Sequence, residues 1–155
     1  MRRVLLTGMS GTGKSTLVLV QELRARGYKA VDVGEPGWSE YDAEGDWVWR
    51  EERIRELLAE DDADLLFISG CATNQVKFYE HFDHVILLSA PPEVLLERLS
   101  SRSTNSYGKS PMERADVLRY VRTVEPQLRR TAGHEIETTV SVDEVVAILL
   151  QLVSA

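Results

Sequence analysis

Residues 8–16 read Gly8-Met9-Ser10-Gly11-Thr12-Gly13-Lys14-Ser15-Thr16 in this chain of 155 residues. The stretch fits the pattern G-x-x-x-x-G-K-[ST], the P-loop, and lies between a short apolar run and a segment with apolar residues at helical spacing. Its glycines let the backbone turn its N–H groups inward around phosphate oxygens. The following helix directs the positive end of its dipole at the same anion. The stretch therefore predicts that the chain binds a nucleoside triphosphate.

Two side chains of this stretch have a defined task in the pattern. Lys14 neutralises the β- and γ-phosphates, and the Ser15 hydroxyl ligates Mg²⁺. We therefore expect ATP and ADP as partners and Mg²⁺ as the cofactor, with GTP in place of ATP left open. The nucleotide-binding residues predicted here are Gly8, Ser10, Gly11, Thr12, Gly13, Lys14, Ser15 and Thr16.

The composition is that of one globular domain over residues 1–155. Hydrophobic residues make up 43% and charged residues 28% of the chain, which is typical of soluble proteins. The single cysteine, Cys71, excludes an internal disulfide and favours a reducing, cytoplasmic location. No apolar stretch approaches membrane-span length, and the net charge of −7 argues against a nucleic-acid partner.

The charge is distributed unevenly along the chain. Residues 35–64 contain twelve acidic residues and three arginines, whereas residues 98–130 contain eight basic and three acidic residues. An acidic protein that concentrates its positive charge in one stretch can use that charge on an anion. Arginines scattered over a solvated helix face explain the same pattern equally well.

Apolar runs of strand length alternate with helical patterns, which predicts an α/β fold with a parallel sheet covered on both faces. Loop signals mark residues 35–45, and Pro126 is expected to kink or end the helix in which it lies. We expect strands at 3–7, 29–33, 65–68, 84–89 and 134–139, helices at 17–25, 47–60, 91–101, 111–130 and 141–153, and a short helix or turn at 74–82.

Ligands of such sheets bind beyond the carboxyl ends of the strands, and Asp32 stands at one of these ends. A carboxylate there can hold Mg²⁺ or take the proton from an attacking hydroxyl, although Asp also starts turns. Glu35 competes for the same role. The third strand ends without an acid, at Ser69-Gly70, which argues against motor-type and AAA-type ATPases. A GTPase is disfavoured too, because no Asn-Lys-x-Asp motif is present.

Residues 34–60 form the predicted acceptor-binding segment, which holds all three tryptophans of the chain. Aromatic rings beside a phosphate site can form the wall for a sugar or base, or they can pack beneath the loop as a small core. Arg50 and Arg53 stand one helical turn apart and could act as a pair. The acceptor-binding residues predicted here are Asp32, Glu35, Trp38, Arg50, Arg53, Gly70 and Cys71.

Residues 101–112 are interpreted as a lid. Arg98 and Arg102 are four residues apart at the end of the preceding helix, so they share a face of it. Closure of the lid would exclude water and bring arginines to the transferred phosphoryl group. Exposed arginines without such a task are the alternative. The predicted catalytic residues are thus Lys14, Asp32 and Arg102, with Ser15 and Asp32 as metal ligands.

With its P-loop, the acid after the second strand, Gly70 after the third and the arginine-bearing lid, the chain resembles the small P-loop metabolite kinases: shikimate kinase, gluconate kinase and their adenylate-kinase-like relatives. The resemblance implies a five-stranded sheet in the order 2-3-1-4-5, adenine near residues 139–142, and Arg98 stacked on that base. Shikimate kinases have a second aspartate after the second strand, where this chain has Asp32-Val33-Gly34. They also have a richer glycine turn than Ser69-Gly70-Cys71. Both departures argue against shikimate as the acceptor.

The expected activity is transfer of the γ-phosphate of ATP to a hydroxyl of a small molecule such as a sugar, nucleoside or antibiotic. The acidic, Trp-rich segment favours a neutral or cationic ring compound, unless its acids are merely solvated. One alternative is a nucleoside monophosphate kinase, in which Arg50 and Arg53 would bind the acceptor phosphate. Another is a nucleotide-binding regulatory module without catalysis.

Overall fold

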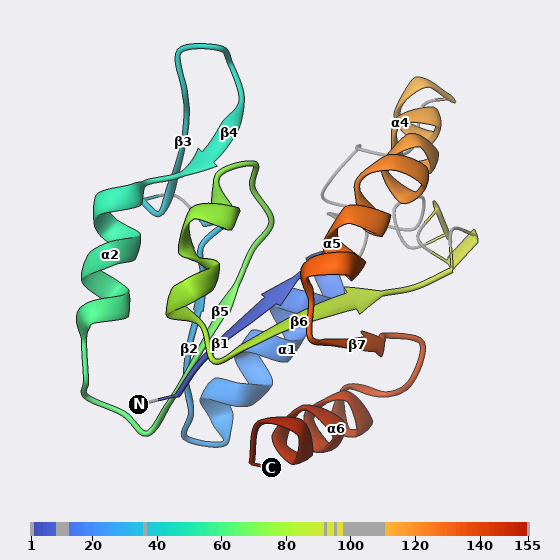
Figure 1. Ribbon diagram of the computed structural model, residues 1–155. Helices are drawn as coiled ribbons and strands as arrows, with labels where there is room; N and C mark the ends of the chain where they lie inside the picture. The colour runs from blue at the N-terminus through green and yellow to red at the C-terminus, as the bar shows by residue number, and fades with distance from the viewer. Residues whose placement is uncertain are drawn as a thin grey trace.

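Five parallel strands form the central sheet of the computed structural model (Figure 1). The structure describes residues 2–8, 13–35, 37–91, 93–94, 96–97 and 111–154, of which residues 13–17, 47, 111–114, 116 and 117 are described by their backbone alone. The sheet strands are β1 (Arg2–Thr7), β2 (Lys29–Asp32), β5 (Leu65–Ser69), β6 (His84–Ser89) and β7 (His134–Glu137). Their spatial order is β2-β5-β1-β6-β7. Numbered as sheet strands along the chain this is 2-3-1-4-5, so the expected topology is confirmed.

Helices cover both faces of the sheet (Figure 1). Helices α1 (Gly13–Ala25) and α6 (Val142–Ser154) pack on one face. Helix α2 (Glu51–Ala59) and the 3₁₀-helix η2 (Gln75–His81) pack on the other. Helices α4 (Pro111–Thr123) and α5 (Glu125–Thr131) come next in the chain, and α4 begins within the last two residues of the predicted lid. No helix in the described part of the chain is both long and apolar enough to cross a membrane.

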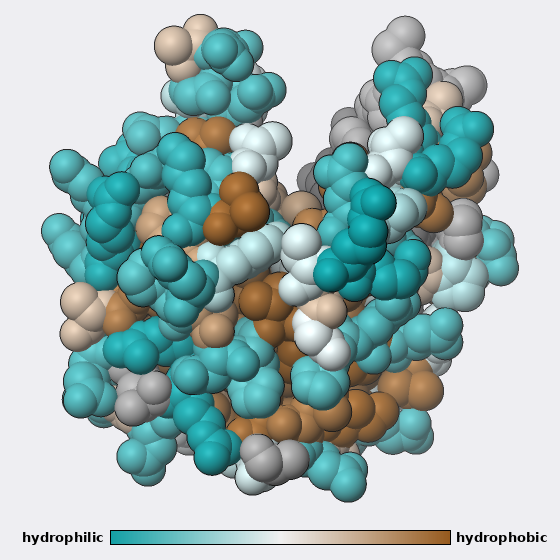
Figure 2. All heavy atoms as spheres, viewed as in Figure 1, coloured by the Kyte–Doolittle hydropathy of each residue, from teal (hydrophilic) through white to brown (hydrophobic). Residues whose placement is uncertain are grey.

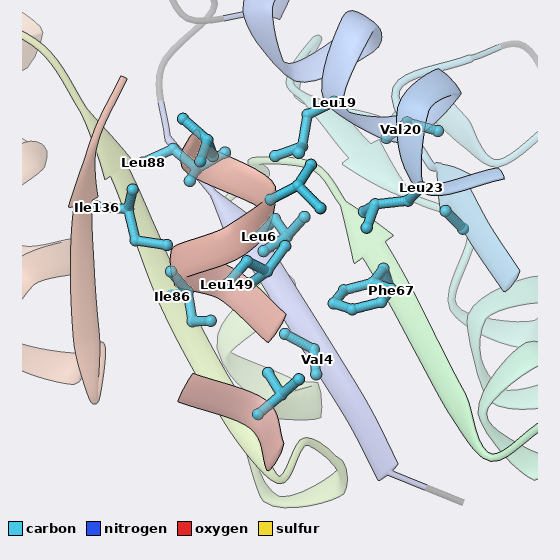
Figure 3. Close-up of a cluster of buried hydrophobic side chains, with 14 residues drawn as sticks. Val4, Leu6, Leu19, Val20, Leu23, Phe67, Ile86, Leu88, Ile136 and Leu149 are labelled. Atoms are coloured by element: carbon cyan, nitrogen blue, oxygen red, sulfur yellow. The ribbon is translucent and has the colours of Figure 1, made fainter. Parts of the chain in front are cut away.

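Alternation along β1 divides the core into two layers, because successive side chains of a strand point to opposite faces. Val4 and Leu6 pack toward α1 and α6, where they meet Phe67 and Leu149 (Figure 3). Leu5, between them, packs in the opposite layer. Such double burial explains why the strands read as short continuous apolar runs. The second layer also contains Ile54, Leu57, Leu66, Ile68 and Phe78.

Gly27 ends α1 as the sequence predicts. Its φ of +91° lies in the left-handed region that a residue without Cβ adopts at low cost. The Gly27 N–H donates to the Arg24 carbonyl at 3.0 Å, and the Tyr28 N–H donates to the Leu23 carbonyl at 3.0 Å. These two bonds form a Schellman motif, which turns the chain directly into β2.

Two sequence-based boundaries are wrong in the segment after β2. Part of the expected loop is β3 (Ser39–Tyr41), and the expected helix at 47–60 begins with β4 (Trp47–Trp49) before α2 starts at Glu51. The two strands pair antiparallel, with Tyr41 opposite Trp47. The turn between them is stabilised by Asp42, whose carboxylate accepts N–H bonds from residues 44 and 46 at 2.9 Å each. Cross-strand pairing thus overrides the helical composition.

Other boundaries agree more closely with the expectation. The break at Pro126 is confirmed, because α4 ends at Thr123 and α5 begins at Glu125, which places proline in the first turn of the new helix. The Ser141 side chain accepts the Glu144 N–H at 3.2 Å, as a capping residue should. The helix expected at 91–101 lies mostly outside the described residues.

Trp49 anchors the β3–β4 hairpin to the core. It is 2% exposed and packs on Phe78 with ring centroids 6.0 Å apart. Its ring also lies against Gly70, just beyond β5. A Cβ at Gly70 would stand 2.5 Å from Val33 Cγ2 and 3.1 Å from Trp49 Nε1. Trp49 therefore packs as part of a core beneath the loop, which is the second alternative that the sequence analysis gave for the aromatic residues. This packing requires a glycine at position 70.

We expect Gly70→Ala to destabilise the protein by about 1–3 kcal/mol, since overpacking forces Val33 and the indole to shift. Urea unfolding would measure the change in free energy. Gly133→Ala is the matched control, because the nearest atom to its added Cβ is Val85 O at 3.9 Å; its stability should stay within about 1 kcal/mol of the wild type. Equal stability of the two variants would contradict the proposed close packing.

Candidate nucleotide and acceptor site

The carboxyl ends of the parallel strands meet at one edge of the sheet, as predicted. In the strand register Leu6 pairs with Ser69, and Ser69 pairs with Asp32. The three residues form one row across this edge. The P-loop leaves β1 at Gly8, and α1 begins at Gly13. The edge thus brings the start of the P-loop and the predicted acid to the same side of the molecule.

Several predicted residues lie outside the described part of the chain. These are Ser10, Gly11, Thr12, Arg98 and Arg102, together with lid residues 101–110. The side chains of Lys14, Ser15 and Thr16 are likewise not described. Their roles remain predictions.

Asp32 is half-buried at the end of β2. Its Oδ1 accepts the Gly34 N–H at 2.9 Å, which is the turn geometry that Asp commonly adopts. Among the described residues its second carboxylate oxygen has no hydrogen-bond partner, and carboxylate oxygens are ligands that Mg²⁺ prefers. Glu35 is exposed, and its N–H donates to the Asp32 carbonyl at 3.2 Å. The turn role and a metal or base role for Asp32 are therefore compatible.

Arg50 and Arg53 do not act as a pair in this structure. The Arg53 guanidinium lies over the Trp38 ring, 4.6 Å from its centroid, a cation–π contact. Arg50 precedes α2 and lies 3.8 Å from the Glu40 carboxylate, measured from Nε to Oε2. The structure thus brings Trp38 and Arg53 together, as an acceptor wall requires, and gives Arg50 a different partner.

Asn74 fixes the hairpin that carries Trp38. Its Oδ1 accepts the Trp49 N–H, and its Nδ2 donates to the Trp49 carbonyl, both at 3.0 Å. This pair imitates the bonds of a neighbouring strand at the edge of β4. Lys77 and Asn74 donate to Glu51, and these bonds hold the pKa of its carboxyl below the ordinary value. Composition and spacing carried no sign of this function of Asn74.

A buried polar chain connects β1 with the loop after β5. Gln75 is 3% exposed, and its Nε2 donates to Thr7 Oγ1 at 3.1 Å and to the Tyr79 hydroxyl at 2.8 Å. Its Oε1 accepts the Ala72 N–H at 2.9 Å. Buried polar groups of this kind need partners, and Gln75 finds them on both sides. It therefore ties the residue that precedes the P-loop to the tip of β5.

Cys71 lies beside this chain. Its Sγ is 3.9 Å from the Tyr120 hydroxyl on α4. Although the residue as a whole is exposed, burial raises the pKa of the Cys71 thiol, because a desolvated thiolate is disfavoured. The pKa of the Tyr120 hydroxyl is raised as well, mainly by burial and to a smaller extent by the neighbouring Cys71. Both groups are therefore neutral at physiological pH.

An open groove of about 640 Å³ lies between η2 and the α4–α5 pair. We call it the Cys71 groove, and Figure 2 shows a hollow between the part of the molecule with η2 and the part with α4 and α5. Of the predicted acceptor residues, Cys71 is the one that lines it. The sequence analysis did not identify the other residues that line the groove, because they come from two segments about fifty positions apart. Its lining includes Cys71, Gln75, Val76, Tyr79, Tyr120 and Val124.

Arg129 attaches α5 to the sheet. It donates to Glu125 at 2.9 Å and to Glu135 at 2.6 Å, while the Ser89 hydroxyl donates to Glu135 at 2.7 Å. The Arg129 guanidinium is the main reason that the pKa of the Glu135 carboxyl lies below its ordinary value. Two carboxylates thus balance this arginine.

The residues expected near adenine, 139–142, lie just beyond β7. The preceding residue, Thr138, bonds to the Ser89 carbonyl. The nearness of residues 139–142 to adenine stays a prediction.

The raised pKa of Cys71 predicts slow alkylation. At pH 8 its thiolate fraction should be lower than that of free cysteine, and the rate should continue to rise as pH passes the ordinary thiol value. Iodoacetamide labelling followed by intact mass, against glutathione as the reference, measures this. A rate profile that coincides with the reference would show that the thiol is not desolvated.

Comparison with known proteins agrees with this architecture. A search of the curated proteins found no match. Shikimate kinase from Acinetobacter baumannii in complex with shikimate superimposes with a TM-score of 0.68 at 20% identity, covering 99% of this chain and 93% of that one. Shikimate kinase from Bacteroides thetaiotaomicron gives 0.68 at 20% identity, with 99% of each chain covered. TT1252 from Thermus thermophilus gives 0.60 at 19% identity, covering 99% and 96%. At these identities the likeness shows the fold.

A family model described as an AAA domain, AAA_18, matches residues 4–119. Together with the shikimate kinase structures, this match confirms the predicted small P-loop kinase type. The argument against an AAA-type ATPase rested on the end of the third strand, and β5 does end in Ser69 rather than in an acid. The chain belongs to the AAA_18 family of AAA domains and has the P-loop fold of the shikimate kinases.

Proposed function

We propose that this protein transfers the γ-phosphate of ATP to a hydroxyl group of a small molecule. The observation that carries the proposal is the row Leu6–Ser69–Asp32 at the carboxyl edge of the sheet. It places the acid two strand spacings, about 10 Å, from the strand that leads into the P-loop. Family membership and the kinases that share the fold support the same reaction class.

Phosphoryl transfer requires a positioned acceptor and balanced charge more than covalent chemistry. Lys14 would neutralise the phosphates, and Arg102 would reach them from the lid, residues 101–112. Asp32 would orient the acceptor hydroxyl and accept its proton, with Glu35 as the competing base. Ser15 and Asp32 would hold Mg²⁺, which would supply positive charge to balance the charge on the phosphates.

A nucleoside monophosphate kinase is less well supported. That activity needs free arginines for a phosphate dianion, yet Arg50 lies beside Glu40 and Arg53 stacks on Trp38. Acidic residues 40, 42, 44 and 46 lie exposed in the β3–β4 hairpin that precedes these arginines. A regulatory module without catalysis is distinguished by a simple test, because an enzyme forms ADP faster when its acceptor is added.

We expect Asp32→Asn to lower acceptor-dependent ADP formation by about 10²- to 10⁴-fold, which is the usual contribution of a general base. Asparagine retains an oxygen for the Gly34 N–H, so the turn should persist. The acceptor is found first by a thermal-shift screen of sugars, nucleosides and antibiotics with Mg²⁺ and ADP, because a bound ligand stabilises the folded state.

Asp64→Asn is the matched control, since Asp64 lies just before β5, at the opposite edge of the sheet. Its turnover should equal that of the wild type. If Asp32→Asn retains turnover within a few-fold of wild type while Glu35→Gln loses it, Glu35 is the base. If neither substitution lowers turnover, the proposed mechanism is wrong.

A further inference from the structure

The part of the Cys71 groove that the structure describes is lined by uncharged residues. Some of these residues are polar and others apolar, and none is Asp, Glu, Lys, Arg or His. Its volume, about 640 Å³, lies within the range of small-molecule sites. We propose that the Cys71 groove is the acceptor pocket and that it takes an uncharged ring compound bearing hydroxyl groups. This inference rests on the proposed kinase function.

The groove lies beside the start of the P-loop. The Cys71 thiol interacts with Thr7 and with the Gly8 backbone, and Gly8 is the first residue of the P-loop motif. Gln75, which lines the groove, bonds to Thr7 from the same side. A compound in the groove therefore has one end next to the chain that leads into the phosphate site, as an acceptor requires.

Two tyrosines supply the recognition chemistry. The Tyr79 hydroxyl accepts a bond from Gln75, which leaves its own proton to donate, and the Tyr120 hydroxyl stands beside Cys71. Tyrosine combines an apolar ring face with a polar end, so such a pair suits a hydroxylated ring. Val76 and Val124 add apolar surface that is 60% and 37% exposed. The groove offers neutral hydrogen bonds and ring contacts together.

A charged acceptor would be disfavoured in this groove. A carboxylate or phosphate that loses its water needs a cation or several donors in exchange. Arg129 on α5 is already bound by Glu125 and Glu135. An ammonium group likewise meets no carboxylate among the described lining residues. Because the described lining residues offer no counter-charge, we expect the groove to select uncharged compounds.

The single cysteine allows a direct test on the intact protein, independent of catalysis. Three disulfides that differ only in a cyclohexanol, cyclohexanecarboxylate or cyclohexylammonium ring compete for Cys71 under 2-mercaptoethanol, and intact mass measures capture. Exchange with glutathione corrects for intrinsic reactivity. We expect the cyclohexanol to be captured about tenfold more than either charged ring. Capture of a charged ring equal to or above that of the cyclohexanol would overturn the inference.

Val76→Lys should shift capture toward the carboxylate by about tenfold, because it adds a cation at an exposed position of the groove. Val18→Lys is the matched control, since Val18 is 41% exposed on α1 and does not line the groove; its capture pattern should remain that of the wild type. An identical pattern in both variants would show that the fragments bind outside the groove.

A final measurement separates this inference from the proposed function. The cyclohexanol adduct should bind Mg²⁺ and ADP with unchanged affinity while acceptor-dependent ADP formation falls at least tenfold. Unchanged ADP formation by the adduct would refute the groove as the acceptor pocket and leave the kinase function intact. If the unmodified protein forms no acceptor-dependent ADP across the acceptor screen, the kinase function itself is refuted.

Discussion

Parallel pairing of β1 with β5 and β6 is the constraint on which the rest of this structure depends. Because all five strands of the sheet run the same way, their carboxyl ends share one edge, and the register places Leu6, Ser69 and Asp32 in one row. The P-loop, the acid and the tip of β5 are distant in sequence and adjacent only through this pairing. Burial on both faces makes the register costly to change, since a one-residue slip would turn Val4 and Leu6 out of their layer.

Packing at the tip of β5 joins the predicted acceptor-binding segment to this edge. Trp49 fills the space beside Gly70, and Asn74 pairs with both backbone groups of Trp49. The β3–β4 hairpin, which follows Trp38 and leads into the helix α2 that carries Arg53, is thereby held from the core side and from the edge side. Gly70 has a steric reason to be glycine that is independent of any ligand, while its expected contact with the acceptor stays a prediction.

Among the described residues, the charged side chains lie outside the lining of the Cys71 groove. Acidic residues 40, 42, 44 and 46 are exposed to solvent, and Arg129 is balanced by two carboxylates. This exposure favours the alternative that the acids are merely solvated over the hypothesis that they select a cationic acceptor. The proposed acceptor pocket relies instead on neutral hydrogen bonds at Tyr79 and Tyr120. The same distribution weakens the case for a phosphorylated acceptor.

The sequence by itself determined the α/β class, the P-loop, the positions of the sheet strands, the end of α1 at Gly27 and the break at Pro126. These features depend on local patterns: apolar runs, glycine and proline geometry, and capping residues. Only the tertiary structure decided that Trp47–Trp49 is a strand and Trp49 a core residue, that Arg50 and Arg53 have separate partners, and that Gln75, Tyr79 and Tyr120 meet at a groove beside Cys71. These depend on contacts between segments far apart in the chain, and no local pattern encodes which partner a polar or aromatic side chain will find.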